Sequence, residues 1–231
     1  MIVLIEGNIG AGKTTYLKYI EYELKRKEKD IMCSVLYEPV DKWLNLNNNY
    51  DLLDMFYKES DNYIVADLQI YIILTMMKNH WEAHIKHNNN NQQIIFMERS
   101  VLTGVECFAK VLNSRGKIHD RLYDILKEGV KQMHMLKPDH IIYLKINHVP
   151  MLMDRISKRG RECEQTNANS NILTEKYLKD LNDAYDDFMY NTDIPVTVIP
   201  MNDSDDIEVM YKTYISPLIT NWMKEIKKKN R

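Results

Sequence analysis

Short runs of apolar, mostly β-branched residues recur along the chain, and longer amphipathic stretches separate them. The five runs cover residues 2–5, 33–37, 94–97, 140–144 and 196–199. Each run has the length of a buried strand, whereas the intervals between them are long enough for helices. Strands that alternate with helices are typical of parallel β-α-β units, in which helices cover both faces of the sheet. The pattern therefore predicts an α/β fold with a five-stranded parallel sheet flanked by helices.

The segment 165–171 interrupts this pattern. It is polar, rich in Asn and without apolar periodicity, and a helical pattern opens after it near Thr174 and Glu175. Polar segments of this kind are tolerated where the chain runs over the surface. We therefore expect a mobile loop at 165–171 and a helix after it.

The charge balance argues against nucleic acid or an anionic membrane as the partner. Lys and Arg number 31 against 33 Asp and Glu, which gives a net charge of -2, and we interpret the basic stretch 224–231 as a solvated helix end. The apolar run at residues 2–5 is too short for a signal peptide, and no run of about eighteen apolar residues occurs elsewhere. We expect a cytoplasmic protein that binds small molecules.

Length and cysteine content narrow the class further. A chain of 231 residues can form one well-buried core, so we expect a single domain over residues 1–231. Cys33, Cys107 and Cys163 are odd in number and widely spaced, which predicts neither a disulfide framework nor a metal clip. This usage is typical of a reducing compartment.

The first apolar run leads directly into a match to G-x-x-x-x-G-K-[ST]. The loop and the residue that follows it are Gly7, Asn8, Ile9, Gly10, Ala11, Gly12, Lys13, Thr14 and Thr15. A strand before the loop and an amphipathic run after it, at residues 15–27, are the context that a phosphate loop requires. In such loops backbone N–H groups surround the β-phosphate, the lysine reaches the β- and γ-oxygens, and the hydroxyl ligates Mg²⁺. We therefore expect a P-loop NTPase fold that binds ATP through Lys13 and Mg²⁺ through Thr14, although the loop alone does not distinguish a hydrolase, a motor and a small-molecule kinase.

Acidic residues follow the second and third apolar runs, Glu38 after one and Glu98 with Arg99 after the other. Ligands of open α/β folds bind at the carboxyl ends of the strands, so we expect these side chains to share one site. Glu38 is a candidate general base, because a hydroxyl acceptor loses a proton as it takes the phosphoryl group. Glu98 can hold Mg²⁺ directly or through water, and Arg99 can meet the acceptor oxygen and the γ-phosphate. A phosphate acceptor would need cations instead of a base.

The phosphate loop, Glu38-Pro-Val-x-x-Trp43 and Glu98-Arg99-Ser100, in this order, resemble the deoxynucleoside kinases of the cellular deoxycytidine kinase and insect multisubstrate kinase type. The resemblance continues through residues 52–58, 68–71 and 155–164, and covers the chain from residue 2 to about residue 190. It implies transfer of the ATP γ-phosphoryl group to the 5′-hydroxyl of a deoxynucleoside. It also implies a lid at about residues 155–171.

The resemblance assigns roles to single residues. Glu38 is the base on the 5′-hydroxyl with Arg99 beside it, and Gln69 reads the base edge, because an amide donates and accepts side by side. The other implied positions are Tyr57 and Glu164 at the 3′-hydroxyl, Trp43 and Phe108 against the base, and Arg159 and Arg161 as lid cations over the triphosphate.

Some positions depart from the family pattern. Leu68 replaces the aromatic residue that usually precedes the base-reading glutamine, and Cys163 stands where a second acid is common. In the purine-accepting relatives an arginine and an aspartate face the base, whereas the matching positions here are Met76 and Gly104, with Ile72 one turn before Met76. Purine polar groups without partners cost about 1 to 3 kcal/mol each, whereas Gly104 leaves room for a 5-methyl group. We expect thymidine and deoxycytidine to be preferred.

Two other functions stay open. A deoxynucleoside monophosphate kinase of the thymidylate kinase type shares the fold and the loop, but usually has an Asp-Arg pair and an arginine before Glu-Pro where this chain has Glu98-Arg99 and Tyr37-Glu38. A nucleotide-binding regulatory subunit would keep the pocket with little chemistry, which the full set of reactive side chains argues against.

Two expectations concern the long helical stretches. His80, His84 and His87 have helical spacing but no accompanying carboxylate or cysteine ligands, so we interpret them as surface residues rather than a metal site. Relatives pair through long helices after the second and third strands, so we expect a homodimer.

Overall fold

A five-stranded parallel sheet forms the centre of the computed structural model, which describes residues 1–27, 33–58, 62–90, 92–132, 137–164 and 172–229. The strands are β1 (Ile2–Glu6), β2 (Cys33–Leu36), β3 (Ile94–Glu98), β4 (His140–Lys145) and β5 (Val196–Pro200). Their order in the sheet is β2-β3-β1-β4-β5, and every neighbouring pair is parallel. The predicted α/β fold is confirmed, and each predicted strand lies within one residue of the observed one at its carboxyl end.

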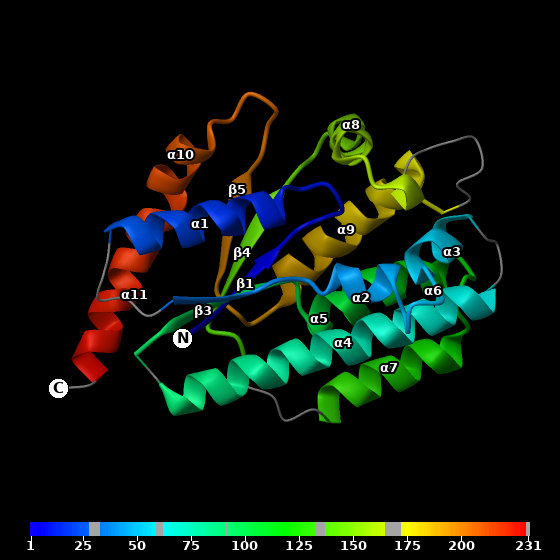
Figure 1. Ribbon diagram of the computed structural model, residues 1–231, viewed down its shortest axis with the longest axis horizontal. Helices are drawn as coiled ribbons and strands as arrows, with labels where there is room; N and C mark the ends of the chain where they lie inside the picture. Colours follow the sequence, from blue (N-terminus) through cyan, green and yellow to red (C-terminus); the bar gives the residue numbers. More distant parts are fainter. Residues whose placement is uncertain (28–32, 59–61, 91, 133–136, 165–171, 230–231) are drawn as a thin grey trace.

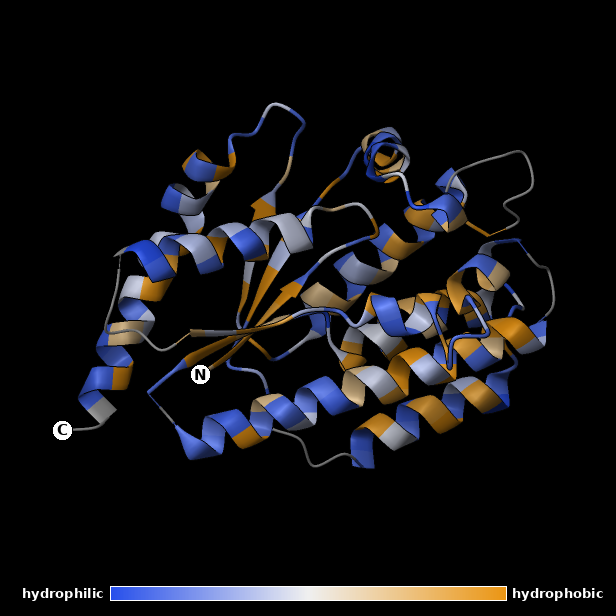
Figure 2. Ribbon diagram, viewed as in Figure 1, coloured by the Kyte–Doolittle hydropathy of each residue, from blue (hydrophilic) through white to orange (hydrophobic). Residues whose placement is uncertain are grey.

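Alternate residues of each central strand face opposite sides of the sheet. Val3 and Ile5 of β1 belong to the larger hydrophobic cluster, whereas Ile2 and Leu4 belong to the smaller one. β3 divides in the same way, because its even-numbered apolar residues join the larger cluster and its odd-numbered ones the smaller. Both faces of the sheet are therefore buried, which explains why the strands read as continuous apolar runs. Figure 2 shows these strands as a hydrophobic centre among mixed helices.

Helices lie on both sides of this sheet (Figure 1). They are α1 (Lys13–Lys27), α2 (Val40–Leu44), α3 (Leu52–Lys58), α4 (Asn62–Asn89), α5 (Val101–Thr103), η1 (Gly104–Ala109), α6 (Lys110–Ser114), α7 (Asp120–Gln132), α8 (Val149–Arg159), η2 (Glu162–Glu164), α9 (Glu175–Asn191), α10 (Ile207–Met210), η3 (Tyr211–Ile215) and α11 (Ser216–Lys229). Leu17, Ile20 and Leu24 of α1 pack in the larger cluster, whereas Ala83 of α4 packs in the smaller. Among the described residues, no helix combines the length and apolar content that a bilayer crossing requires.

Helix α9 begins where the sequence predicts. Thr174 is its N-cap, and the Thr174 hydroxyl accepts a hydrogen bond from the backbone N–H of Tyr177. Residues 165–171, predicted as a mobile loop and as part of the lid, lie outside the described residues. Of the predicted lid at about residues 155–171, the structure therefore describes residues 155–164. The carboxyl ends of the strands meet beside α8 and α9, and this edge carries the site.

Candidate phosphoryl-transfer site

A cavity of about 650 Å³ opens at the carboxyl edge of the sheet. Its walls combine the first turn of α1 with residues that follow β2 and β3, and with parts of α3, α4, η1, α8 and η2. Most residues that the sequence singled out line it, namely Ile9, Gly10, Gly12, Lys13, Thr14, Thr15, Glu38, Trp43, Tyr57, Gln69, Glu98, Arg99, Gly104, Phe108, Arg159, Arg161 and Glu164. Gly7, Asn8 and Ala11 form the inner part of the loop and are not among the lining residues.

The phosphate loop adopts a backbone that side chains would obstruct. Gly7 has φ +149°, and a Cβ there would lie 2.7 Å from the carbonyl oxygen of Leu144 in β4. Gly10 has φ +79°, and its Cβ would lie 3.0 Å from the carbonyl oxygen of Leu152 in α8. Glycine tolerates positive φ and allows this close approach to backbone. The loop thus packs directly on β4 and α8.

Asn8 ties the loop to α9. Its Oδ1 accepts from the backbone N–H of Ile9, and its Nδ2 donates to the carbonyl of Leu178 and to Oδ1 of Asn182, each at 2.7 Å. The side chain is buried, so these bonds also satisfy groups that would otherwise be costly to remove from water. Asn8 holds the loop and does not face the cavity.

Lys13 lies folded across the loop. Its Nζ donates to the carbonyl oxygens of Gly7 at 3.1 Å and Asn8 at 2.9 Å, and the side chain is buried. Burial and the neighbouring Arg99 together lower the pKa of Lys13 to about 7, against the opposing effect of Glu38 and Glu98. A triphosphate in the loop would supply the negative charge that restores the protonated form.

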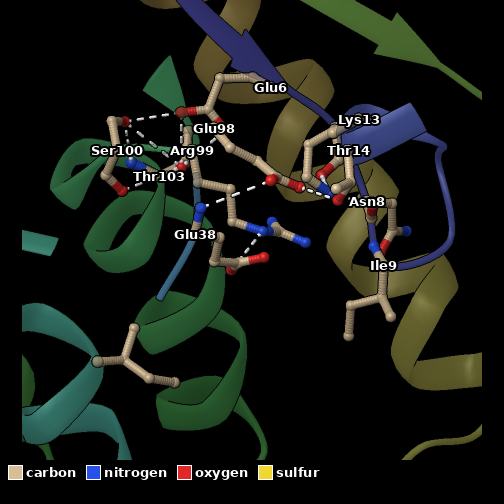
Figure 3. A network of polar contacts seen from close by, with 12 residues as sticks. Glu6, Asn8, Ile9, Lys13, Thr14, Glu38, Glu98, Arg99, Ser100 and Thr103 are labelled. Atoms are coloured by element: carbon tan, nitrogen blue, oxygen red, sulfur yellow. Dashed lines mark hydrogen bonds and ion pairs between the residues drawn. The ribbon is translucent and has the colours of Figure 1, made fainter. Parts of the chain in front are cut away.

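Thr14 and Glu98 face each other across the cavity floor (Figure 3). The Thr14 hydroxyl donates to Oε1 of Glu98 at 2.6 Å, and Oε2 of Glu98 accepts from the backbone N–H of Glu38 at 3.5 Å. A hydroxyl and a carboxylate that meet next to a phosphate loop are the oxygen ligands that Mg²⁺ takes from proteins, since the ion keeps waters and substrate phosphates as its other ligands. The donor set fits Mg²⁺ better than a metal that prefers nitrogen or sulfur.

Glu38 and Arg99 form an ion pair above this floor. Nε of Arg99 lies 2.8 Å from Oε1 of Glu38, without the alignment of a hydrogen bond. The Glu38 side chain retains 17% exposure, so it stays open to the cavity, whereas the Arg99 side chain is 8% exposed. A carboxylate in this setting can accept a proton from a hydroxyl, while the guanidinium beside it can stabilise anionic oxygens.

Arg99 has an unusual backbone for a residue with a side chain. Its φ is +62°, and its N–H donates to the carbonyl of Ile5 at 3.0 Å, which keeps it attached to β1 where β3 ends. A positive φ is uncommon for a residue with a long side chain, and such residues recur at functional sites. The turn directs Arg99 into the cavity, while Ser100 begins α5 as its N-cap.

Sequence reasoning missed Glu6, the last residue of β1. Glu6 is fully buried, and its carboxylate accepts hydrogen bonds from the hydroxyls of Ser100 at 2.7 Å and Thr103 at 2.9 Å (Figure 3). Burial raises the pKa of Glu6 to about 7, against the lowering effects of Arg99 and the two hydroxyls. The available signal was its position, because Glu6 is an acid at the carboxyl end of a central strand, as Glu98 is.

Gln69 is buried on α4, and its Nε2 donates to the carbonyl of Gly104 at 2.8 Å. Gly104 also lines the cavity, and the room that we expect it to leave for a 5-methyl group stays a prediction. A Cβ at Gly104 would lie 2.8 Å from Cδ1 of Ile73, so the direction of a side chain there points at α4. Glycine at this position permits close packing of η1 on α4.

The aromatic positions differ in how they meet the cavity. Trp43 is buried and its indole N–H donates to the Thr75 hydroxyl at 2.9 Å, which fixes the ring beside α4. Tyr57 is also buried, and desolvation raises its pKa well above the ordinary value, so its phenol stays protonated. Phe108 is half-buried, and the Arg99 guanidinium carbon lies 4.6 Å from the ring centroid. One face of Phe108 thus supports Arg99 through a cation–π contact.

The two lid arginines share one carboxylate. Nε of Arg159 donates to Oε2 of Glu164 at 2.9 Å, the Nη2 of Arg159 contacts the same oxygen, and Nη1 of Arg161 donates to Oε1 at 3.2 Å. Glu164 is buried, whereas the arginines remain about one third exposed. In this arrangement the residues implied for the triphosphate and for the 3′-hydroxyl bind each other.

The cavity is also lined by residues that the sequence analysis did not select, including Tyr16, Arg155, Asn202 and Asp205. Arg155 donates to the carbonyl of Asn202 at 3.2 Å and pairs with Asp203. A segment after β5 is thereby attached to α8. Only spatial proximity reveals these lining residues, since residues 16 and 155 belong to separate helices and residue 202 follows β5.

One prediction about the histidines is wrong. His80 is buried, and its Nε2 accepts a hydrogen bond from the backbone N–H of Val101 at 3.3 Å. Desolvation lowers the pKa of His80 to about 4, so the ring is neutral and caps the start of α5. His84 is half-buried and its Nε2 contacts Asn88, and no group of metal-ligating side chains forms among the described residues.

Comparison with known proteins agrees with this geometry. A model of the family described as deoxynucleoside kinase matches residues 3–226. Human mitochondrial thymidine kinase 2 is 27% identical over 191 residues, which cover 81% of this chain and 64% of that protein. A deoxyadenosine kinase of Dictyostelium discoideum is 28% identical over 208 residues, which cover 89% of this chain and 74% of that protein. The chain thus spans less than two thirds of thymidine kinase 2.

A solved structure has the same fold. It is a deoxyadenosine kinase from M. mycoides with the products dCMP and a flexible dCDP bound, and its TM-score to this chain is 0.71. The alignment covers 97% of this chain and 100% of that chain, at 24% sequence identity. At this identity the likeness supports the fold of the sheet and its helices.

Proposed function

This chain belongs to the deoxynucleoside kinase family, and from that premise we propose that it transfers the γ-phosphoryl group of ATP to the 5′-hydroxyl of a deoxynucleoside. The observation that supports this best is the pairing of Glu38 with Arg99 in the cavity that the phosphate loop also lines. A neutral hydroxyl acceptor needs a base at this point, and Glu38 is a partly exposed carboxylate with a cation beside it.

The chain's own residues divide the work in this proposal. Glu38 takes the proton from the 5′-hydroxyl, Arg99 stabilises charge on the transferring oxygens, and Lys13 neutralises the β- and γ-phosphates. Arg159 and Arg161 add charge from the lid side. Thr14 and Glu98 would hold Mg²⁺, which neutralises phosphate charge when bound. Positioning and electrostatics account for catalysis in such a site, because phosphoryl transfer needs little covalent help from the protein.

We also propose that pyrimidine deoxynucleosides are preferred. Gln69 is the polar side chain at the base end, while Leu68, Ile72 and Met76 line the same wall without polar atoms for purine groups. An unpaired polar group on a buried base costs about 1 to 3 kcal/mol. The family match leaves the base open, since its relatives include thymidine and deoxyadenosine kinases.

Phosphoryl transfer from γ-labelled ATP with Mg²⁺ tests both proposals in one experiment. The acceptors are thymidine, deoxycytidine, deoxyadenosine and deoxyguanosine, assayed beside their 5′-monophosphates. We expect turnover of thymidine and deoxycytidine and little turnover of the monophosphates. Turnover of monophosphates alone would identify a monophosphate kinase, and comparable kcat/KM for deoxyguanosine and thymidine would refute the pyrimidine preference.

We propose a homodimer that forms through α4. Tyr63, Ile70, Leu74, Trp81 and Ile85 are exposed on this helix and follow one another at intervals of seven and four residues. This spacing places them on one face of the helix, and Tyr63 and Trp81 are 81% and 63% exposed. A contiguous exposed apolar stripe is typical of a protein interface.

Sedimentation analysis of Trp81→Glu tests the dimer. A charge on this apolar stripe should convert the dimer to a monomer, whereas Tyr190→Glu on α9, a residue that is 89% exposed, should leave the mass unchanged. A monomeric wild-type protein would refute the proposal.

A further inference from the structure

A buried tyrosine of α9, Tyr185, contacts Arg99 from outside the cavity lining. The Tyr185 hydroxyl accepts a hydrogen bond from Nη1 of Arg99 at 2.5 Å and donates one to Oε2 of Glu6 at 3.4 Å. Tyr185 is fully buried and does not line the cavity. The phenol therefore connects a guanidinium that reaches the cavity to a carboxylate that does not.

Glu6 makes this connection rigid. Its two oxygens also accept from the hydroxyls of Ser100 and Thr103, which begin the helix after Arg99. A guanidinium only donates hydrogen bonds, so the Tyr185 hydroxyl accepts from Nη1 of Arg99 and turns its own proton to Oε2 of Glu6. Arg99 and Glu6 together thus determine the direction of the phenol O–H.

The ring of Tyr185 is fixed independently of its hydroxyl. It stacks on Tyr143 of β4 at a centroid distance of 5.9 Å and an interplanar angle of 11°. It also makes a T-shaped contact with Phe108, with ring centroids 6.2 Å apart, and the Arg99 guanidinium lies over the Phe108 ring. The ring and the hydroxyl therefore reach Arg99 by separate contacts, which allows the hydroxyl to be removed alone.

We propose that Tyr185 is a positioning residue for phosphoryl transfer, whose hydroxyl, oriented by Glu6, holds the Arg99 guanidinium beside Glu38. Nε of Arg99 lacks a hydrogen bond of good geometry to Glu38, so that ion pair alone does not fix the plane of the guanidinium. The short bond from Nη1 to Tyr185 anchors the other end of the guanidinium, whose face rests on the Phe108 ring, and these contacts together define its orientation. This inference rests on the proposed function.

The variant that tests it is Tyr185→Phe, which removes one oxygen and keeps the ring contacts. We expect kcat to fall about tenfold or more, with KM for ATP and nucleoside within about threefold of wild type, because a bond to a charged group is lost at the reacting centre and not at the binding contacts. Tyr143→Phe is the matched control, since it removes the hydroxyl of the stacked neighbour, which bonds Asp186 at 3.0 Å instead of Arg99. We expect its kcat to remain within twofold of wild type.

A double-mutant cycle separates positioning from a general structural role. Arg99→Lys removes the planar guanidinium, so adding Tyr185→Phe to it should cost little more than Arg99→Lys alone. Fully multiplicative losses would overturn the proposal, as would an unchanged kcat in Tyr185→Phe or an equal loss in Tyr143→Phe. Glu6→Gln is a second variant, and we expect a smaller kcat loss of the same kind.

Crystal structures of Tyr185→Phe and Tyr143→Phe test the proposal without an activity assay. The Arg99 guanidinium should turn away from Glu38 in the first and keep its place in the second. An unmoved guanidinium in Tyr185→Phe would overturn the proposal. If the wild-type chain phosphorylated no acceptor, the proposed function would fail, while this structural comparison would still decide the role of Tyr185.

Discussion

The Thr14 hydroxyl donates to Oε1 of Glu98 at 2.6 Å, which joins the first turn of α1 to the end of β3. These residues are 84 positions apart in the chain, and the parallel pairing of β1 with β3 brings them together. Both side chains present oxygen toward the phosphate loop. A side chain of the phosphate loop and one from a strand end thus meet because of the strand order.

Glu98→Gln should weaken the response to Mg²⁺. The amide keeps the shape of the side chain but removes the negative charge, so the Mg²⁺ concentration for half-maximal activity should rise about tenfold or more. A Mg²⁺ titration of initial rates at saturating ATP measures it. Asp41→Asn, an exposed acid of α2, is the control, and equal Mg²⁺ dependence in all three proteins would contradict the assignment.

Glu38→Gln should remove the base and keep the site. We expect kcat to fall about 10² to 10⁴-fold, because general base catalysis contributes on that order. The affinities for ATP and nucleoside should stay within a few-fold, since Gln keeps the hydrogen-bonding shape. Rapid-quench kinetics with isothermal titration of each ligand distinguishes these effects, and a kcat within tenfold of wild type would show that Glu38 is not the base.

Glu6 should make the stability of the protein depend on pH in the acid range. Its folded-state pKa is about 7 against an ordinary 4.5, so the folded protein retains a proton that the unfolded chain releases between these values. The contribution of Glu6 to the free energy of unfolding is fully present below about pH 4.5. It declines as the pH rises to 7, by roughly 3 kcal/mol in total. Urea unfolding at pH 5, 6 and 7 should therefore show a flatter trend for Glu6→Gln.

The pKa of Lys13 sets the upper pH limit of the unfolding experiment on Glu6. Its folded-state pKa is lowered to about 7 from 10.5, so above pH 7 the unfolded chain binds more protons and stability rises with pH. Below pH 7 Lys13 is mostly protonated in both states and contributes little to the slope. Identical slopes for wild type and Glu6→Gln between pH 5 and 7 would contradict the raised pKa of Glu6.

Gly104→Ala should destabilise the fold through one contact. The new methyl group would lie 2.8 Å from Cδ1 of buried Ile73, and overpacking of this kind typically costs about 1 to 3 kcal/mol. Ile73→Val removes that Cδ1 atom, so the double variant should be more stable than Gly104→Ala alone. Chemical denaturation of the four proteins measures it, and strictly additive losses would show that the two positions do not interact.

The sequence predicted the strands because central parallel strands are apolar on both faces. It ended β1 and β3 one residue early, since apolar periodicity stops at an acid, whereas Glu6 and Glu98 are buried strand residues with hydrogen-bond partners. Motif spacing also located Lys13, Glu38 and Arg99, because parallel strands deliver their carboxyl ends to one edge.

The contacts from α9 could not be predicted in this way. Asn8 bonds Asn182, which lies 174 positions away, and Arg99 bonds Tyr185, which lies 86 positions away. A tyrosine and an asparagine on an amphipathic helix carry no motif, and their partners follow from how the helix packs. The close approach of Gly104 to Ile73 could not be predicted for a similar reason, since the direction of a missing side chain depends on the backbone of η1 and on the neighbouring α4.

Glu164 pairs with both Arg159 and Arg161, although the proposed roles direct these groups to different ligands. A triphosphate that draws the arginines away leaves a buried carboxylate without its cations, and a 3′-hydroxyl that engages the carboxylate loosens the arginines. Each ligand thus lowers the free-energy cost that the other meets. The two substrates should bind with positive cooperativity, and the coupling must be equal in both directions, so either one alone will bind more weakly than it does in the ternary complex.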